Sequence, residues 1–309
     1  MKPSLSIVIP VYNSSLTLPD LTHQLGHELP ELCDQYEVIL VNDGSRDSSW
    51  QTICQLAVEY PWVRGVNLMR NYGQHNALLC GIRAAANEII VTMDDDLQHP
   101  PAEIHHLLDR LGNDWDVVYG TPHAEQHGLW RDLASQITKL ALRSAMGIDT
   151  ARKVSAFRAF RSQLREAFQR YQGPHASIDV LLTWGTNRFS SVDVRHQPRL
   201  AGQSNYTFRK LVSHTINMMT GFSTLPLRLA SMVGFFFTLF GMAVLVYVIG
   251  RYLIQGGSVP GFPFLASIIA LFSGAQLFAL GIIGEYLARM HFRMMDKPTY
   301  AVREEIRGK

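Results

Sequence analysis

Residues 88–101, EIIVTMDDDLQHPP, decide how this chain folds and where its chemistry lies. The first six are mostly apolar and β-branched, which is typical of a buried strand in a parallel sheet. The two prolines at the end cannot continue a strand and suit the first turn of a helix, which we predict over residues 102–111. Three carboxylates are therefore expected at the carboxyl end of a strand, where open α/β sheets bind ligands: Asp94, Asp95 and Asp96.

The acidic cluster points to a cation. Adjacent carboxylates repel one another unless a positive charge compensates them, and hard oxygen ligands favour Mg²⁺ or Mn²⁺. Mg²⁺ usually binds one or two protein carboxylates and completes its shell with substrate phosphates. The cluster thus predicts a site for a metal ion and a diphosphate. A solvated acidic turn is the alternative, which the preceding apolar strand makes the weaker one.

The composition limits the class of protein. The 309 residues carry a formal net charge of only +2, so the sequence offers no case for nucleic-acid binding. The three cysteines, Cys33, Cys54 and Cys80, form no close pair, which argues against both a zinc site and a disulfide framework. We expect them to be core thiols in a reducing compartment. The N-terminus shows no signal-peptide pattern.

Two uncharged segments near the C-terminus predict a transmembrane hairpin. Residues 229–250 and 262–284 are each long enough to cross a hydrocarbon core of roughly 30 Å as a helix. Their length and phenylalanine content disfavour the alternative, a pair of buried core helices. Basic residues flank the pair, whereas the loop between the segments offers only Arg251. The positive-inside rule therefore places both ends in the cytoplasm.

The rest of the chain alternates strands and helices. Apolar runs predict strands at residues 5–11, 37–41, 63–68 and 116–120, with helical patterns between them. This βαβα order predicts an α/β domain, with a mainly parallel sheet and helices on both faces. No G-x-G-x-x-G follows the first strand, which argues against a nicotinamide-type Rossmann domain. The predicted parts are a cytoplasmic α/β domain (1–207), a juxtamembrane amphipathic segment (208–228), two transmembrane helices (229–288) and a cytoplasmic tail (289–309).

Several motifs occur in a recognisable order. Residues 6–13 (SIVIPVYN), 41–45 (VNDGS) and 94–101 (DDDLQHPP) together resemble family 2 glycosyltransferases with the GT-A (Rossmann-like) fold. Residues 70–75 (RNYGQH) and 284–286 (GEY) are similar to the polyprenyl-phosphate branch of that family. That branch includes bactoprenol glucosyltransferases and undecaprenyl-phosphate 4-deoxy-4-formamido-L-arabinose transferases, and the chain leans toward the latter.

The resemblance implies a role for each matching residue. It assigns Pro10, Tyr12, Asn13, Asp43, Asn71, Asp94 and Asp95 to the UDP-sugar donor, although Asp95 receives no primary role because relatives often have alanine there. It assigns Asp94, Asp96 and Gln98 to Mg²⁺ or Mn²⁺. It assigns Arg131, Ser135, Arg158, Arg199 and Ser204 to the acceptor phosphate, with Arg199 and Ser204 on a loop that closes over the phosphates. The catalytic set is Asp94, Asp96, Arg131 and Ser135.

The implied reaction transfers one sugar from a UDP-sugar to undecaprenyl phosphate with inversion, making a lipid-linked sugar for cell-envelope glycan or lipid A modification. The enzyme would act as a homo-oligomer in the lipid bilayer of the bacterial inner membrane. An ionised phosphate acceptor needs little help from a base, and Ala156 stands where some relatives carry a carboxylate. A processive polysaccharide synthase is one alternative, although the chain lacks the further spans and the Q-x-x-R-W motif. A non-catalytic membrane scaffold is the other.

Overall fold

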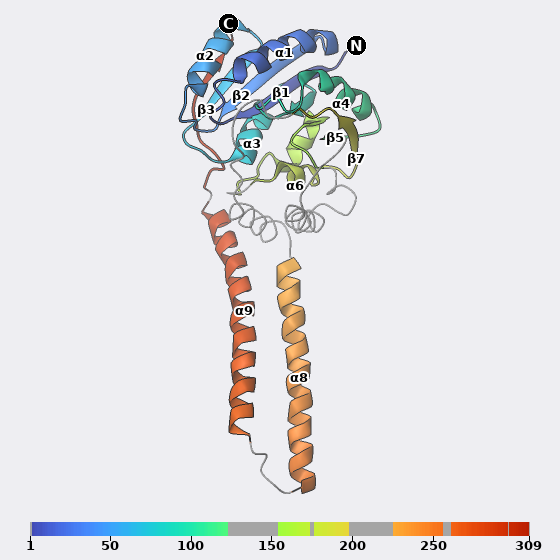
Figure 1. The fold of residues 1–309 in the computed structure, drawn as a ribbon, viewed down its shortest axis with the longest axis vertical. Coiled ribbons are helices and arrows are strands. Elements are labelled where there is room, and N and C mark those ends of the chain that lie inside the picture. Colours follow the sequence, from blue (N-terminus) through green and yellow to red (C-terminus); the bar gives the residue numbers. More distant parts are fainter. Residues whose placement is uncertain are drawn as a thin grey trace. The chain divides into compact units, whose positions relative to one another are not determined.

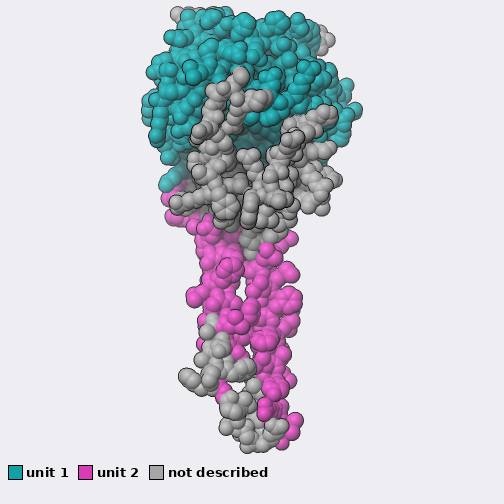
Figure 2. Space-filling model, viewed as in Figure 1, with its two compact units in different colours: residues 1–215, 296–309 teal, residues 216–295 magenta. Residues whose placement is uncertain are grey.

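The computed structural model describes residues 2–122, 154–173, 176–197, 225–255, 261–295 and 297–308. The chain divides into two compact units (Figure 2). The first comprises residues 1–215 and 296–309, and the second comprises residues 216–295. The C-terminal residues thus belong to the same unit as the N-terminal domain, although the second unit separates them in the sequence.

The described part of the first unit is built on one sheet of eight strands in the order β7-β5-β6-β4-β1-β2-β3-β8. Strand β1 pairs in parallel with both β2 and β4, β2 with β3, and β5 with β7, whereas β6 and β8 run antiparallel to their neighbours. The predicted mainly parallel sheet is therefore confirmed. The bounds are β1 Ser4–Val11, β2 Gln35–Asn42, β3 Val63–Leu68, β4 Ile89–Thr92, β5 Val117–Pro122, β6 Arg158–Arg161, β7 Phe189–Val194 and β8 Val302–Arg307.

Helices cover both faces of this sheet, as the βαβα order predicts (Figure 1). Ile7 and Ile9 of β1 face one apolar cluster, and Val8 between them faces the other, because successive strand residues point to opposite faces. Helices α1 Leu18–Leu32, α2 Ser49–Glu59 and α4 Ile104–Leu111 pack on the first face, and α3 Gln74–Ala84 and α6 Ile178–Leu182 on the second. The described residues of this unit also form two 3₁₀ helices, η1 Pro101–Glu103 and η3 Ser162–Phe168.

The C-terminal segment differs from its prediction. The predicted cytoplasmic tail, residues 289–309, contains the end of α9 and strand β8, which extends the sheet beyond β3. The register shifts between Asn67 and Leu68, where β8 begins its pairing with the end of β3. Strand β8 thereby covers an edge of the sheet that would otherwise expose unpaired backbone groups.

The second unit contains α8 Leu225–Gln255 and α9 Phe262–Met294, both longer than predicted. Each includes a stretch long and apolar enough to cross a membrane by length and composition: Leu227–Arg251 with mean hydropathy 2.4, and Leu271–Ala288 with mean hydropathy 1.4. The helices pack together where the Phe237 and Phe272 rings meet edge to face, 5.6 Å apart. Gly241 permits this approach, because a Cβ there would lie 3.0 Å from the Phe272 ring.

Candidate active site

Four neighbouring parallel strands end at one edge of the sheet. From β1 the chain continues to β2 and β3 on one side, and it later returns to β4 on the other side of β1. Such a reversal of strand order leaves a crevice outside the carboxyl ends of the strands, where open α/β sheets bind ligands. The motifs predicted to bind the donor follow β1, β2, β3 and β4, so the topology brings all four to this edge.

The turn after β1 presents Tyr12 and holds Asn13 in an unusual conformation. Asn13 has φ 57°, in the left-handed region that asparagine tolerates better than most residues. Its backbone N–H donates to Ser45 Oγ (3.0 Å), and its Oδ1 accepts from the Arg46 N–H (2.8 Å). The turns after β1 and β2 are thus joined. Tyr12 is 39% exposed, whereas Pro10 is buried at the end of the strand.

Asp43, directly after β2, holds the loop after β3. One carboxylate oxygen accepts from the Tyr72 N–H (2.7 Å) and the other from the Gly73 N–H (2.8 Å). Burial raises the pKa of Asp43 to about 6, although these two hydrogen bonds oppose the shift. Gly44 has φ +64°, and a Cβ there would lie 2.5 Å from the backbone N of Asn71. The side chain of Asn71 is exposed beside this contact.

The acidic cluster after β4 has three half-buried carboxylates with different partners. Asp94 Oδ1 accepts from Gln74 Nε2 (2.7 Å), and Asp96 Oδ1 accepts from the Gln98 N–H (3.1 Å). Leu97, which follows them, is 4% exposed with φ 59°. A buried leucine in the left-handed region is a strained arrangement that persists only where the surroundings impose it. The turn thus brings the Gln98 backbone N–H to the Asp96 carboxylate.

Asp95 connects two of the turns. Its Oδ2 accepts from the Tyr12 N–H (3.3 Å), which ties the end of β4 to the end of β1. Burial raises the pKa of Asp95 to about 6, the neighbouring Asp96 adds to this effect, and hydrogen bonds from Ser14 and Tyr12 oppose it. In the structure Asp95 therefore holds the turn after β1 against the end of β4.

A histidine pair that the sequence analysis did not single out lies beside the cluster. The His99 ring stacks on Phe157 (5.1 Å between centroids) and meets His196 edge-on (5.0 Å). Burial, followed by the nearby His196, lowers the pKa of His99 to about 4, so this ring is neutral at pH 7. The Gln197 N–H donates to the Gln98 carbonyl (2.8 Å). Residues 196–197 are therefore held against the acidic turn, although they are 99 residues away in the sequence from residues 97–98.

Arg158 requires a correction. Its side chain was predicted to bind the acceptor phosphate, but it is 1% exposed and forms a buried ion pair with Asp179. Its Nε donates to Thr92 Oγ1 (3.1 Å), and the Tyr119 hydroxyl donates to Asp179 Oδ1 (3.2 Å). The guanidinium thus joins β6, β4 and α6 inside the fold, where a lipid phosphate does not reach it.

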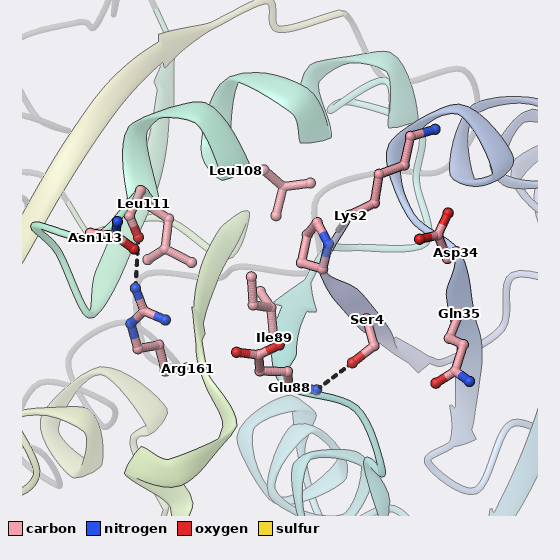
Figure 3. A pocket seen from close by; sticks show the side chains of 12 residues that line it. Lys2, Ser4, Asp34, Gln35, Glu88, Ile89, Leu108, Leu111, Asn113 and Arg161 are labelled. Carbon is pink, nitrogen blue, oxygen red and sulfur yellow. Dashed lines mark hydrogen bonds between the residues drawn. The ribbon is translucent and has the colours of Figure 1, made fainter.

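The other predicted acceptor residues, Arg131, Ser135, Arg199 and Ser204, lie outside the described residues. A separate pocket of about 590 Å³ lies at the opposite edge of the sheet, near the amino ends of β1, β2 and β4 (Figure 3). Lys2, Asp34, Glu88 and Arg161 contribute charges of both signs to its lining. None of the predicted site residues that the structure describes lines this pocket.

The carboxyl edge fits a hard divalent cation. Among the described residues, no three His, Cys, Asp or Glu side chains converge as they would in a closed protein metal site. Asp94 and Asp96 instead offer two carboxylates on one strained turn at the edge of the sheet, with the Gln98 amide following them. This oxygen donor set suits an ion that takes its remaining ligands from a bound diphosphate.

The family model described as glycosyl transferase family 2 matches residues 6–172, more than half of the chain, including all four motifs at this edge. This chain belongs to glycosyl transferase family 2. The family 2 chain is 33% identical over 307 residues to the undecaprenyl-phosphate 4-deoxy-4-formamido-L-arabinose transferase of Pectobacterium atrosepticum, covering 98% of this chain and 94% of the relative. It is 35% identical over 308 residues to the protein of the same name from Shewanella sediminis, covering 98% and 92%.

Solved structures show that this family 2 glycosyltransferase has the GT-A fold. Glucosyl-3-phosphoglycerate synthase of Mycobacterium tuberculosis, solved with Mn²⁺, UDP and phosphoglyceric acid, superposes with a TM-score of 0.53 at 18% identity, covering 71% of this chain and 76% of that one. A mannosyltransferase of Pyrobaculum calidifontis, solved with GDP-mannose and Mn²⁺, gives 0.52 at 15% identity, covering 93% and 88%. The predicted fold is therefore confirmed.

Proposed function

We propose that this chain transfers one sugar from a UDP-sugar to undecaprenyl phosphate, with inversion at the anomeric carbon. One observation carries the proposal: the turns after β1, β2, β3 and β4 are joined by hydrogen bonds into one polar edge in a chain that belongs to glycosyl transferase family 2. The relatives that match nearly the whole chain are named for transfer of formamido-arabinose to undecaprenyl phosphate. Formamido-arabinose is accordingly the first donor sugar to test.

The donor nucleotide would bind across the turns after β1 and β2. Tyr12 presents a half-exposed ring to a base, and the Asn13–Ser45 hydrogen bond fixes the spacing between the two turns. Asp43 would act on the donor by holding the loop after β3, because both of its carboxylate oxygens accept backbone N–H groups of that loop. The acidic turn after β4, whose carboxylates are half-buried, would bind the sugar and the diphosphate.

Asp94, Asp96 and Gln98 would hold a divalent metal, Mg²⁺ or Mn²⁺, with the donor diphosphate. When bound, such an ion neutralises the charge that develops on a departing UDP. The chain's own part is to keep these oxygens on one turn, which the strained Leu97 and the Gln74 contact to Asp94 do. The acceptor phosphate is already ionised at pH 7, so its oxygen can attack the anomeric carbon without transferring a proton to a base.

The two apolar helices would place this chemistry at a membrane. Most described apolar side chains of α8 and α9 are exposed, among them Phe235, Phe236, Leu253, Leu277 and Phe278. The chain enters α8 from the first unit and, after α9, returns to that unit as β8. If both helices span the bilayer, the start of α8 and the end of α9 lie on the same side of it. The chain on either side of the helix pair belongs to the first unit, so the sheet lies on that side as well. We place that side in the bacterial cytoplasm, by the positive-inside rule and because undecaprenyl phosphate and a UDP-sugar would meet there.

The test is transfer of label from a panel of UDP-sugars into lipid that partitions into organic solvent. It uses the full chain in detergent with undecaprenyl phosphate and either metal. We expect Asp96→Asn to reduce transfer at least about 100-fold, since loss of several kcal/mol of metal stabilisation corresponds to that factor. Asp109→Asn, on an exposed position of α4, is the matched control and is expected to keep the activity.

Each outcome has a defined meaning. Lipid labelling that is lost in Asp96→Asn and in EDTA supports the reaction and identifies the sugar. Recovery of the retained anomer in the product would refute the inverting mechanism. Binding of UDP without transfer from any donor would favour a non-catalytic scaffold, and products with more than one sugar would favour a processive synthase.

A further inference from the structure

Strand β8 carries an exposed glutamate, Glu304, whose carboxylate accepts a hydrogen bond from a buried amide of the first unit. Glu304 Oε1 accepts from Asn67 Nδ2 (2.9 Å), across the β3–β8 pair in which these two residues are register partners. Asn67 is 5% exposed and is the next-to-last residue of β3. This contact therefore connects the last strand of the chain to the end of β3 at the donor edge.

The hydrogen bonding continues from Asn67 to the turn after β2. Asn67 Oδ1 accepts from Asn42 Nδ2 (2.8 Å), and Asn42 Oδ1 accepts from the Ser45 N–H (3.3 Å). Ser45 Oγ in turn accepts from the Asn13 N–H (3.0 Å). A chain of four hydrogen bonds thus leads from Glu304 to the turn that presents Tyr12. We call it the Glu304 relay, consisting of Glu304, Asn67, Asn42, Ser45 and Asn13.

The carboxylate sets the direction of the relay. An ionised carboxylate has no hydrogen to donate, so the Asn67 side chain must turn its NH₂ group toward Glu304. Its oxygen then faces Asn42, which must present its own NH₂ group and is left with its oxygen toward the Ser45 N–H. Both amides are buried, and a reversed amide at either position would leave a donor facing a donor inside the protein.

The geometry points to Glu304 as a positioning residue for the donor nucleotide. Resting on the proposed function, in which the turns after β1 and β2 bind UDP, we infer that Glu304 orders those turns through the Asn67 and Asn42 amides. Glu304 does not touch the donor. The strand that follows the two apolar helices in the sequence is then part of the donor site's support, in addition to covering the sheet edge.

The neighbouring glutamate provides a matched control. Glu305 precedes Ile306 on the same strand and forms an ion pair with Arg64 (2.7 Å), at a side chain 41% exposed. It takes no part in the relay. Glu304→Ala and Glu305→Ala therefore each remove one strand carboxylate and one partner, but only the first removes the relay's acceptor.

The experiment measures UDP binding by calorimetry and, separately, the KM for the UDP-sugar and for undecaprenyl phosphate. We expect Glu304→Ala to raise the UDP Kd and the UDP-sugar KM about fivefold to tenfold, the worth of one ordering hydrogen bond, and to leave the acceptor KM within about twofold. Glu305→Ala is expected to leave all three within about twofold.

A double variant separates ordering from mere stability of the sheet. Asn67→Asp places two carboxylates against each other and should weaken UDP binding at least as much as Glu304→Ala. Adding Glu304→Gln to Asn67→Asp restores the direction, because the amide introduced on β8 donates to the carboxylate introduced on β3, and that carboxylate still accepts from Asn42. We expect the double variant to return the UDP Kd to within about twofold of the unmodified chain.

The results that overturn the inference are specific. Equal Kd values for Glu304→Ala and Glu305→Ala, or a double variant no better than Asn67→Asp alone, would refute the relay. A parallel rise of both KM values would show a general structural role instead. UDP binding is read without turnover, so an unmodified chain that binds UDP but transfers no sugar refutes the proposed reaction and leaves the relay measurable.

Discussion

The buried pair of Arg158 and Asp179 gives the sharpest test of the corrected site. Asp179 is 5% exposed and accepts hydrogen bonds from Arg158 and from the Tyr119 hydroxyl. Asp179→Ala would leave a guanidinium buried without its counter-charge and Tyr119 without its acceptor. Removing one partner of a buried ion pair typically costs about 3–5 kcal/mol. We therefore expect the free energy of unfolding of the first unit to fall by about that amount.

The assay is thermal and denaturant unfolding in detergent, followed by near-UV circular dichroism. For a domain of about 200 residues, 3–5 kcal/mol corresponds to a fall in Tm of roughly 6–20 °C. Glu305→Ala, which removes the partly exposed pair with Arg64 (side chains 41% and 14% exposed), is the control and is expected to cost about 1 kcal/mol or less. A loss of the same size in both variants would refute the reasoning that burial decides the cost.

A second variant distinguishes a structural Arg158 from one that binds the acceptor. Replacing the pair together, as Arg158→Met with Asp179→Leu, removes both charges and should recover much of the lost stability, as apolar replacements of buried ion pairs often do. We expect the recovered protein to bind undecaprenyl phosphate with an unchanged KM. A stable double variant with an acceptor KM raised tenfold or more would show that Arg158 contacts the phosphate and that our correction is wrong.

Two further predictions concern the loops at the donor edge. Because the pKa of Asp43 is raised to about 6, the folded state binds a proton at this carboxylate more tightly than the unfolded state does. The contribution of Asp43 to the free energy of unfolding is therefore present below pH 4 and is lost as the pH rises through about 6. In EDTA, Asp43→Asn should remove up to about 3 kcal/mol of the pH dependence of unfolding that the unmodified chain shows. An identical slope in both proteins would contradict it. Gly44→Ala should lower the free energy of unfolding by about 1–3 kcal/mol and weaken UDP binding, because φ at Gly44 is +64° and its Cβ would lie 2.5 Å from the Asn71 backbone. Gly73→Ala, with φ +94° and no atom within 4 Å of its Cβ, should cost only the backbone strain. Equal losses in the two alanine variants would show that the contact with Asn71 does not matter.

The sequence alone was sufficient to predict the elements whose apolar residues follow a regular strand or helix pattern. Strands β1, β2 and β4 could be predicted because each buries an apolar run, and α1 because its leucines recur at helical spacing, from Leu18 through Leu21 and Leu25 to Leu29. The position of the acidic cluster could also be predicted, because the carboxyl ends of neighbouring parallel strands lie at the same edge of the sheet. The local pattern and the fold agree at these positions.

Partners distant in the sequence could not be predicted in this way. Strand β8 reads VREEIR, with four charged residues among its six, and its partner Asn67 lies 237 residues from Glu304. Nothing local marks such a segment as an edge strand. Arg158 was misassigned for the same reason, because an arginine in a motif suggests a phosphate site until Asp179, on the short helix α6, is known to reach it.

The carboxylates at the donor edge divide into two kinds by what they hold. Asp43 and Asp95 accept backbone N–H groups from other turns, namely the loop after β3 and the turn after β1, and burial raises the pKa of both. Asp94 and Asp96 accept from the Gln74 side chain and from the N–H of their own turn. The first kind builds the edge by joining strand ends that parallel pairing alone leaves separate. The second kind stands on the strained turn at Leu97, where an added cation would offset the repulsion among the acids. In this run of three aspartates, the middle one thus ties the end of β4 to the turn after β1, and we propose that its two neighbours hold the metal ion.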